Sequence, residues 1–314
     1  MRNIRFFLML TLVLSFTACN RKPRITRTDT MTSGIASILC EDCFSPLIQE
    51  EISVFQGLNP EAHVTPIYTD EVTAMNLFMK DSIRLVVAAR DLTAEEFNYL
   101  KSKKLVPRSR RIAVDGIALI INKTNKDSII GIPTFKKILN GEITDWKEID
   151  PQSSLGSIRL VFDNPNSSTV RYVEDSVCGG KAISGNVKAL KSNKEVIDFV
   201  SNTSNAIGII GVGWVSNKKD TTNLSFIDDI RVMSVSPYED ARIDNSYKPF
   251  AAYLALKEYP MVRDIYMITS DVAGGLPAGV LHFVAGDRGQ RIVLKCGLVP
   301  ANRPMRLVYV KSEF

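Results

Sequence analysis

The sequence predicts an α/β protein with two lobes, each built on a mostly parallel sheet that helices cover. Strands and helices alternate through the first part of the chain, which is the pattern of a parallel sheet. Two extended pieces, at residues 111–121 and 248–258, look like strands that cross between the lobes at a hinge. The chain has 314 residues, 45% hydrophobic and 23% charged, so it can form two cores and is not a disordered or collagenous protein.

Three strand–helix units predict the first lobe. Residues 44–58 place their apolar side chains on one helical face, with Pro46 in the first turn. Thr93 and Glu96 form a capping box that opens a later helix. The predicted strands cover residues 34–40, 62–68 and 83–89, and the predicted helices cover 44–58, 71–80 and 94–103.

The pattern after residue 111 predicts a second lobe and a return to the first. A long strand begins at residue 111, and the glycine-punctuated residues 206–215 predict another buried strand. The last predicted helix ends near Gly297. The other predicted elements are a short helix ending near Gly141, a strand at 158–162, helices at 169–177 and 193–201, and strand character over 225–236. We expect lobe 1 to comprise residues 33–115 and 250–314, and lobe 2 to comprise residues 116–249.

The N-terminus carries the pattern of an export signal. Two arginines precede the apolar residues 6–14, and small residues follow up to Cys19. The apolar run is too short to cross a bilayer core of about 30 Å as a helix. The sequence before Cys19 resembles a bacterial lipobox, so we expect residues 1–19 to be a lipoprotein signal, Cys19 to be acylated, and residues 20–32 to be a flexible tether. The protein would then be exported and membrane-anchored. The alternative is an ordinary secretory signal with an incidental cysteine.

Charge and composition exclude several classes of function. The formal net charge of +5 is small and scattered, which predicts no nucleic-acid partner. His63 and His282 lie far apart, and the sequence has no nucleophile elbow, P-loop or dinucleotide motif. We therefore expect no catalytic residue, no metal and no cofactor.

Four cysteines follow Cys19. Cys40 and Cys43 have the C-x-x-C spacing of a redox pair or of half a zinc site, but two acids lie between them and no second half is present. The favoured interpretation is one cysteine at a strand end and one at a helix start. Cys178 and Cys296 complete an even number, which permits disulfides without requiring them.

Two strand-to-helix junctions are candidate anion sites. Residues 163–169 contain two serines and a threonine between an apolar strand and a helix, where hydroxyls and free N–H groups can surround an oxyanion. Cys43 and Phe44 lie at the other junction, and Arg90 follows a buried strand. The structural alternative is that the hydroxyls only cap a helix and that Arg90 is solvated.

Several motifs along the chain resemble those of the PstS-like phosphate-binding proteins of ABC uptake systems. They are VDGIALIINKTN, LNGEITDWKEI, NPNSSTVRYV, NAIGIIGVGWV, YPMVRDIYMI and DRGQRIVLKCGLVP. The resemblance implies a type II periplasmic-binding-protein fold that closes on a dehydrated phosphate without metal. It places the phosphate at Cys43 and Phe44 and at Ser167, Ser168 and Thr169, with Ser168 replacing a glycine of the family.

Two charges differ from the family pattern. The family has an acid where our alignment places Arg84, and an arginine where this chain has Asp163. We expect Arg84 and Asp163 to form a cross-cleft pair of reversed polarity. The alternatives are an alignment that is off by a few residues, or a different ligand. The loop with Asp70 and Glu71 also departs from the family.

The resemblance implies a monomeric binding protein that captures phosphate and delivers it to an ABC permease. The rival interpretations are a receptor for another oxyanion, a phosphate sensor with no transporter, and a periplasmic phosphoryl-transfer enzyme.

Overall fold

The computed structural model describes residues 29–220, 222, 224–271 and 274–304. The predicted signal, including Cys19, and most of the predicted tether lie outside these residues. No helix in the described part of the chain combines the length and the apolar character needed to cross a membrane.

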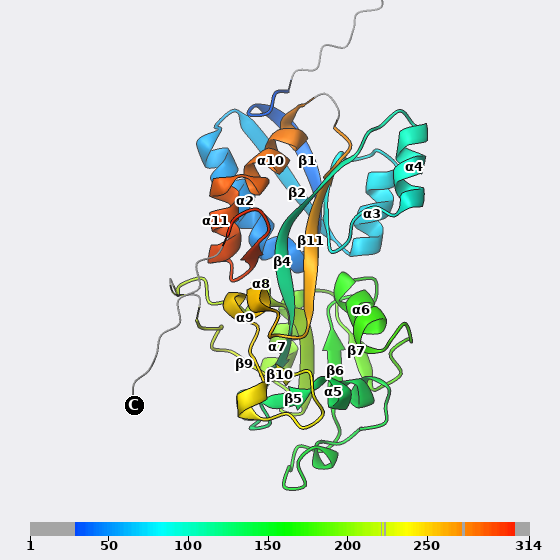
Figure 1. The fold of residues 1–314 in the computed structure, drawn as a ribbon, viewed down its shortest axis with the longest axis vertical. Coiled ribbons are helices and arrows are strands. Elements are labelled where there is room, and N and C mark those ends of the chain that lie inside the picture. Colours follow the sequence, from blue (N-terminus) through cyan, green and yellow to red (C-terminus); the bar gives the residue numbers. More distant parts are fainter. Residues whose placement is uncertain (1–28, 221, 223, 272–273, 305–314) are drawn as a thin grey trace, which may run out of the picture.

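The upper lobe in Figure 1 contains three parallel strands. The order is β2–β1–β3, and the neighbouring helices cover the sheet. The strands are β1 (Gly34–Glu41), β2 (Ala62–Thr69) and β3 (Leu85–Ala88). The helices are α2 (Ser45–Leu58), α3 (Glu71–Met79), α4 (Ala94–Ser102), α10 (Leu276–Ala285) and α11 (Asp287–Lys295). Helix α2 begins with a proline in its first turn, and α4 has the predicted capping box of Thr93 and Glu96.

The lower lobe continues the same sheet with the order β4–β8–β6–β7. Its strands are β5 (Ile129–Gly131), β6 (Arg159–Phe162), β7 (Val187–Ala189), β8 (Ala206–Gly211), β9 (Arg231–Val232) and β10 (Ser234–Ser236). Its helices are α5 (Ile132–Leu139), α6 (Ser168–Tyr172) with a π-helical extension (Val173–Val177), α7 (Asn193–Ser201), α8 (Val212–Val215) and α9 (Ala251–Leu256).

A long strand joins the two lobes. Strand β4 (Arg108–Ile121) pairs with β11 (Val262–Thr269) along its first part and with β8 along its last part. Gly116 lies near the change of partner, where an added Cβ would come within 2.8 Å of Leu254. A larger residue at this position would therefore require the Leu254 side chain of α9 to move.

Three element predictions differ from the structure. The predicted strand 206–215 ends at Gly211, and the remainder is helix α8. The predicted helix ending near Gly297 is divided at Gly286 into α10 and α11. Residues 248–258, predicted as a crossing, contain helix α9, and β11 is instead the strand beside β4.

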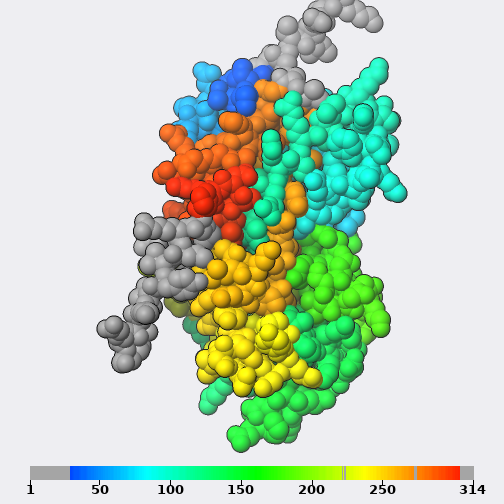
Figure 2. Space-filling model, viewed as in Figure 1, coloured from blue at the N-terminus to red at the C-terminus, as the bar shows by residue number. Residues whose placement is uncertain are grey.

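The lobes are in contact. The largest apolar cluster joins Ile38 and Leu47 of the upper lobe to Val196 and Ile210 of the lower lobe. In Figure 2 the green residues of the lower lobe lie directly against the cyan residues of the upper lobe. The structure therefore shows the two lobes closed on each other.

Candidate functional site

The two predicted strand-to-helix junctions meet between the lobes. Strand β1 ends at Glu41 and a short 3₁₀ turn (Asp42–Phe44) leads into α2, while β6 leads through residues 163–167 into α6. The Cys43 Sγ lies 3.1 Å from the Thr169 Oγ1, and both of these side chains are buried. The structure thus brings Cys43 and Phe44 together with the predicted serine–threonine turn.

An acid that the sequence analysis did not select lies at the centre of this junction. The Glu41 Oε1 accepts hydrogen bonds from the Ser168 N–H at 2.6 Å and from the Ser168 Oγ at 2.5 Å. Glu41 is 1% exposed, and its second oxygen, Oε2, is buried and accepts no hydrogen bond from the residues that the structure describes. Burial raises the pKa of Glu41 to about 8, although Arg263 opposes this rise. The signal in the sequence was an acid at the end of a buried apolar strand.

A buried arginine supplies positive charge to the site. Arg263 Nη1 donates to the Ser168 Oγ at 2.7 Å and to the Thr169 Oγ1 at 3.4 Å. Its Nη2 lies 2.9 Å from the Asp115 Oδ2, and its guanidinium lies over the Phe44 ring, 5.0 Å from the centroid. Burial alone would lower the pKa of Arg263, but the neighbouring acids raise it overall. Arg263 therefore remains charged beside the hydroxyls.

Asp163 orders the loop before α6. Its carboxylate accepts hydrogen bonds from the Ser167 Oγ at 2.8 Å and from the Asn193 Nδ2 at 3.2 Å, and it lies 3.5 Å from the Cys43 Sγ. The Ser167 Oγ also accepts a hydrogen bond from the Val170 N–H as the cap of α6. Burial raises the pKa of Asp163. Ser167 therefore stabilises the loop and the start of α6. Ser168 contacts both Glu41 and Arg263, and Thr169 contacts Arg263.

The predicted pair of Arg84 and Asp163 is wrong. The Arg84 Nε lies 3.4 Å from the Asp81 Oδ1 in a half-exposed ion pair. Strands β1 and β3 are parallel, with Cys40 beside Val87, so the site lies at the carboxyl ends of both strands. Arg84 precedes β3 and lies about 10 Å back along the strand from Val87. The alignment placed the charge at the wrong end of the strand.

Arg90 follows β3, as predicted, but its guanidinium is bound elsewhere. Its two terminal nitrogens each lie 2.7 Å from a carboxylate oxygen of Glu96, at the start of α4. Close by, Glu71 of α3 pairs with Arg171 of α6 across the lobes, with an Nε–Oε2 distance of 2.7 Å. Glu71 is buried and also accepts the Ala89 N–H. Glu71, in the loop whose sequence departs from the family, therefore links the two lobes through Arg171.

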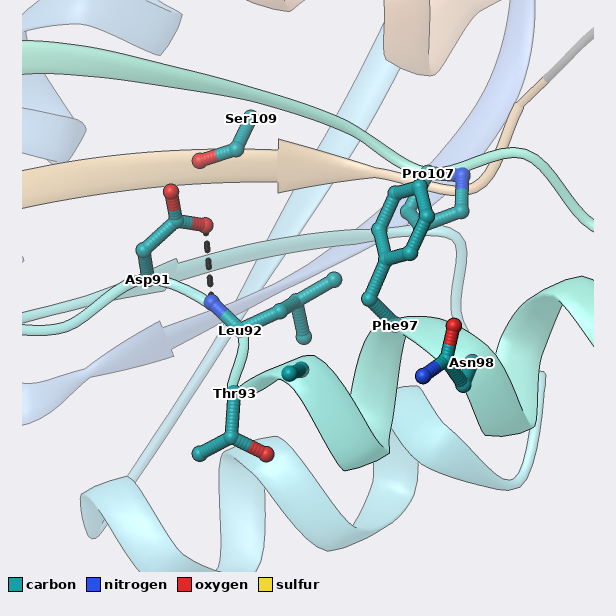
Figure 3. A pocket seen from close by; sticks show the side chains of 8 residues that line it. Asp91, Leu92, Thr93, Phe97, Asn98, Pro107 and Ser109 are labelled. Carbon is teal, nitrogen blue, oxygen red and sulfur yellow. Dashed lines mark hydrogen bonds between the residues drawn. The ribbon is translucent and has the colours of Figure 1, made fainter.

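The described cysteines are free thiols, and a hollow beside α4 lies apart from the junction of Glu41 and Ser168. Cys40, Cys43, Cys178 and Cys296 are all buried free thiols. Burial raises the pKa of Cys43 well above its usual range, and Asp163 adds to the effect. Figure 3 shows a hollow of about 340 Å³ between α4 and the start of β4, lined by residues that include Asp91, Phe97 and Ser109. Ser168, Glu41 and Arg263 do not line it.

The sequence matches the PBP superfamily domain over residues 26–288. The chain belongs to the PBP superfamily. Among its relatives, the phosphate-binding protein PstS of Borreliella burgdorferi is 25% identical over 276 residues, covering 84% of this chain and 89% of that protein. PstS of Bacillus subtilis is 26% identical over 271 residues, covering 85% and 81%.

Two solved structures share the fold of this chain. An ABC-type phosphate transport receptor from Vibrio cholerae has a TM-score of 0.61 at 18% identity, covering 85% of this chain and all of that one. A Clostridium perfringens protein with bound phosphate, described as a substrate-binding protein of a phosphate ABC transporter, has a TM-score of 0.71 at 22% identity and the same coverage. The predicted two-lobed α/β architecture is confirmed.

Proposed function

We propose that this protein is a monomeric extracytoplasmic binding protein that captures inorganic phosphate between its lobes and delivers it to an ABC permease. Its PBP superfamily membership and its similarity to two proteins named PstS support this function. The β4 connection between the lobes supports closure by a hinge motion.

The observation that carries the proposal is a buried donor set that already holds an oxyanion group. The Ser168 N–H and Oγ bind one carboxylate oxygen, and Arg263 donates to the same hydroxyl. The protein's own hydrogen bonds hold these donors in place, which reduces the cost of replacing the water around an anion. Thr169 lies beside these donors, as does the turn with Cys43 and Phe44 that leads into α2. Donors from both lobes can therefore surround a tetrahedral anion.

A threonine substitution tests whether phosphate binds here. Thr169→Val removes a hydroxyl within reach of Arg263 while keeping the shape of the side chain. A hydrogen bond to a charged ligand corresponds to about 10- to 100-fold in affinity, so we expect phosphate binding to weaken by that factor in calorimetry. The matched control is Thr144→Val, at an exposed hydroxyl of the same lobe.

The outcomes separate the competing functions. Phosphate binding that Thr169→Val leaves unchanged would contradict the placement. Preference for sulfate over phosphate in the unaltered chain would identify a receptor for another oxyanion. Turnover of phosphate esters would favour an enzyme, whereas the proposal expects none.

The proposal includes a lipid anchor at Cys19. The short apolar run, the small residues before Cys19 and the polar segment after it support acylation. Cys19→Ser should release the protein from the membrane fraction or stop processing of the signal, and Ser15→Ala in the same segment should change neither. Membrane retention and normal cleavage of the Cys19→Ser chain would leave an ordinary signal as the explanation.

A further inference from the structure

Glu41 bridges the lobes at the donor set that we assign to phosphate. It is the last residue of β1, whereas Ser168 is the first residue of α6 in the other lobe (Figure 1). Its Oε1 takes both the N–H and the hydroxyl of Ser168, the shortest contacts in the site. A phosphate oxygen and the Glu41 oxygen would have to share the single hydrogen of the Ser168 N–H, which weakens the bond to each of them.

The backbone holds Glu41 firmly in this position. Along β1, Glu41 lies beside Thr69 of β2, and the preceding Cys40 lies beside Val87 of β3. A group fixed to a rigid strand reaches its partner without the entropy loss of a free ligand, so its effective concentration is about millimolar or higher. A free phosphate ion has to compete with this tethered group.

The charges around Ser168 also oppose two anions together. Arg263 is the guanidinium in contact with Ser168, and Asp115 already pairs with it. Asp163 lies on the other side of Cys43. A phosphate that entered beside a retained Glu41 would meet three carboxyl groups and one arginine, an environment that disfavours further negative charge.

Glu41 nevertheless satisfies the site only partly. Within the described part of the chain its buried Oε2 accepts no hydrogen bond, so only one of its two oxygens uses the donor set. The Arg263 Nη2, although paired in charge with Asp115, also makes no hydrogen bond. A tetrahedral anion can direct one oxygen to the Ser168 donors and another to the Arg263 Nη2, which gives it a means of displacing the carboxylate.

We propose that Glu41 is an intramolecular competitor of the ligand: its carboxyl group occupies the Ser168 donors, holds the lobes together without phosphate, and must leave them when phosphate binds. This inference rests on the proposed function. It assigns to Glu41 the control of phosphate affinity, and it explains why an acid lies among groups that are arranged to bind an anion.

Calorimetry with inorganic phosphate tests the competition. Glu41→Ala removes the competitor and should tighten phosphate binding about 10- to 100-fold, the value of one hydrogen-bonded charged group. The matched control is Glu51→Ala, which removes another buried carboxylate of the same lobe outside the site and should leave the affinity unchanged. Weaker or unchanged binding by folded Glu41→Ala would overturn the inference and leave the proposed function intact.

Small-angle scattering without phosphate tests the closure independently. The unaltered chain should have a smaller radius of gyration than Glu41→Ala, and added phosphate should restore the smaller value in the variant. An equal radius for the two phosphate-free proteins would overturn the inference whether or not phosphate binds. If neither protein binds phosphate, the proposed function fails, and the scattering comparison still decides whether Glu41 holds the lobes together.

Discussion

At the scale of single residues, the site contains a buried ion pair between two strands. Arg263 and Asp115 lie side by side on β11 and β4 although 148 positions separate them. Both residues fall within motifs that carried the family resemblance, YPMVRDIYMI and VDGIALIINKTN. Their pairing depends on the antiparallel register of two strands, which neither motif contains.

A second buried acid gives a prediction about stability. Glu51 of α2 is fully buried, and neither of its carboxylate oxygens has a hydrogen-bond partner. Burial raises its pKa from 4.5 to about 9. The folded protein therefore holds a proton that the unfolded chain releases as the pH rises from about 4.5, so Glu51 destabilises the fold progressively up to about pH 9.

Glu51→Gln should remove this pH dependence. Urea unfolding at pH 5, 7 and 9 should show the variant gaining free energy of unfolding over the unaltered chain as the pH rises. The neighbouring Glu50→Gln is the control, because Glu50 is half-exposed and pairs with Lys218. A constant difference between the Glu51→Gln variant and the unaltered chain at all three pH values would contradict the assigned pKa.

At the scale of helices and strands, most of the first lobe could be predicted from residue patterns. Strands β1 and β2 lie within a residue of the predicted bounds, and the capping box of Thr93 and Glu96 forms as expected. The failures lie where packing overrides periodicity. The chain turns at Gly286, and α11 then packs closely on α10. Only glycine allows this approach at position 289, because an added Cβ would lie 2.5 Å from the Cα of Val284. The apolar pattern continues through that turn and cannot reveal it.

The candidate site shows the same limit. The sequence identified the turn with Ser167, Ser168 and Thr169 because hydroxyls at a helix start have a local signature. In the sequence, Glu41 is one of two acids between Cys40 and Cys43. Its contact with Ser168 appears only when the end of β1 meets α6. Local chemistry can therefore be predicted from the sequence, whereas contacts between lobes need the three-dimensional arrangement.

At the scale of the whole molecule, the lobes are held closed by polar and apolar contacts together. The ion pair of Glu71 and Arg171 and the hydrogen bonds of Glu41 and Ser168 both cross the lobe boundary. A continuous apolar cluster lies behind them. Closure in our proposal exchanges the Glu41 contact for a phosphate contact, so the ligand replaces one bridge between the lobes with another.

A crystal structure of Glu41→Ala grown with inorganic phosphate tests this account most directly. We expect a phosphate between the lobes, with one oxygen within hydrogen-bond distance of the Ser168 N–H and another near the guanidinium of Arg263. Crystals that contain saturating phosphate but show no anion at Ser168, or show it bound only elsewhere, would contradict the account.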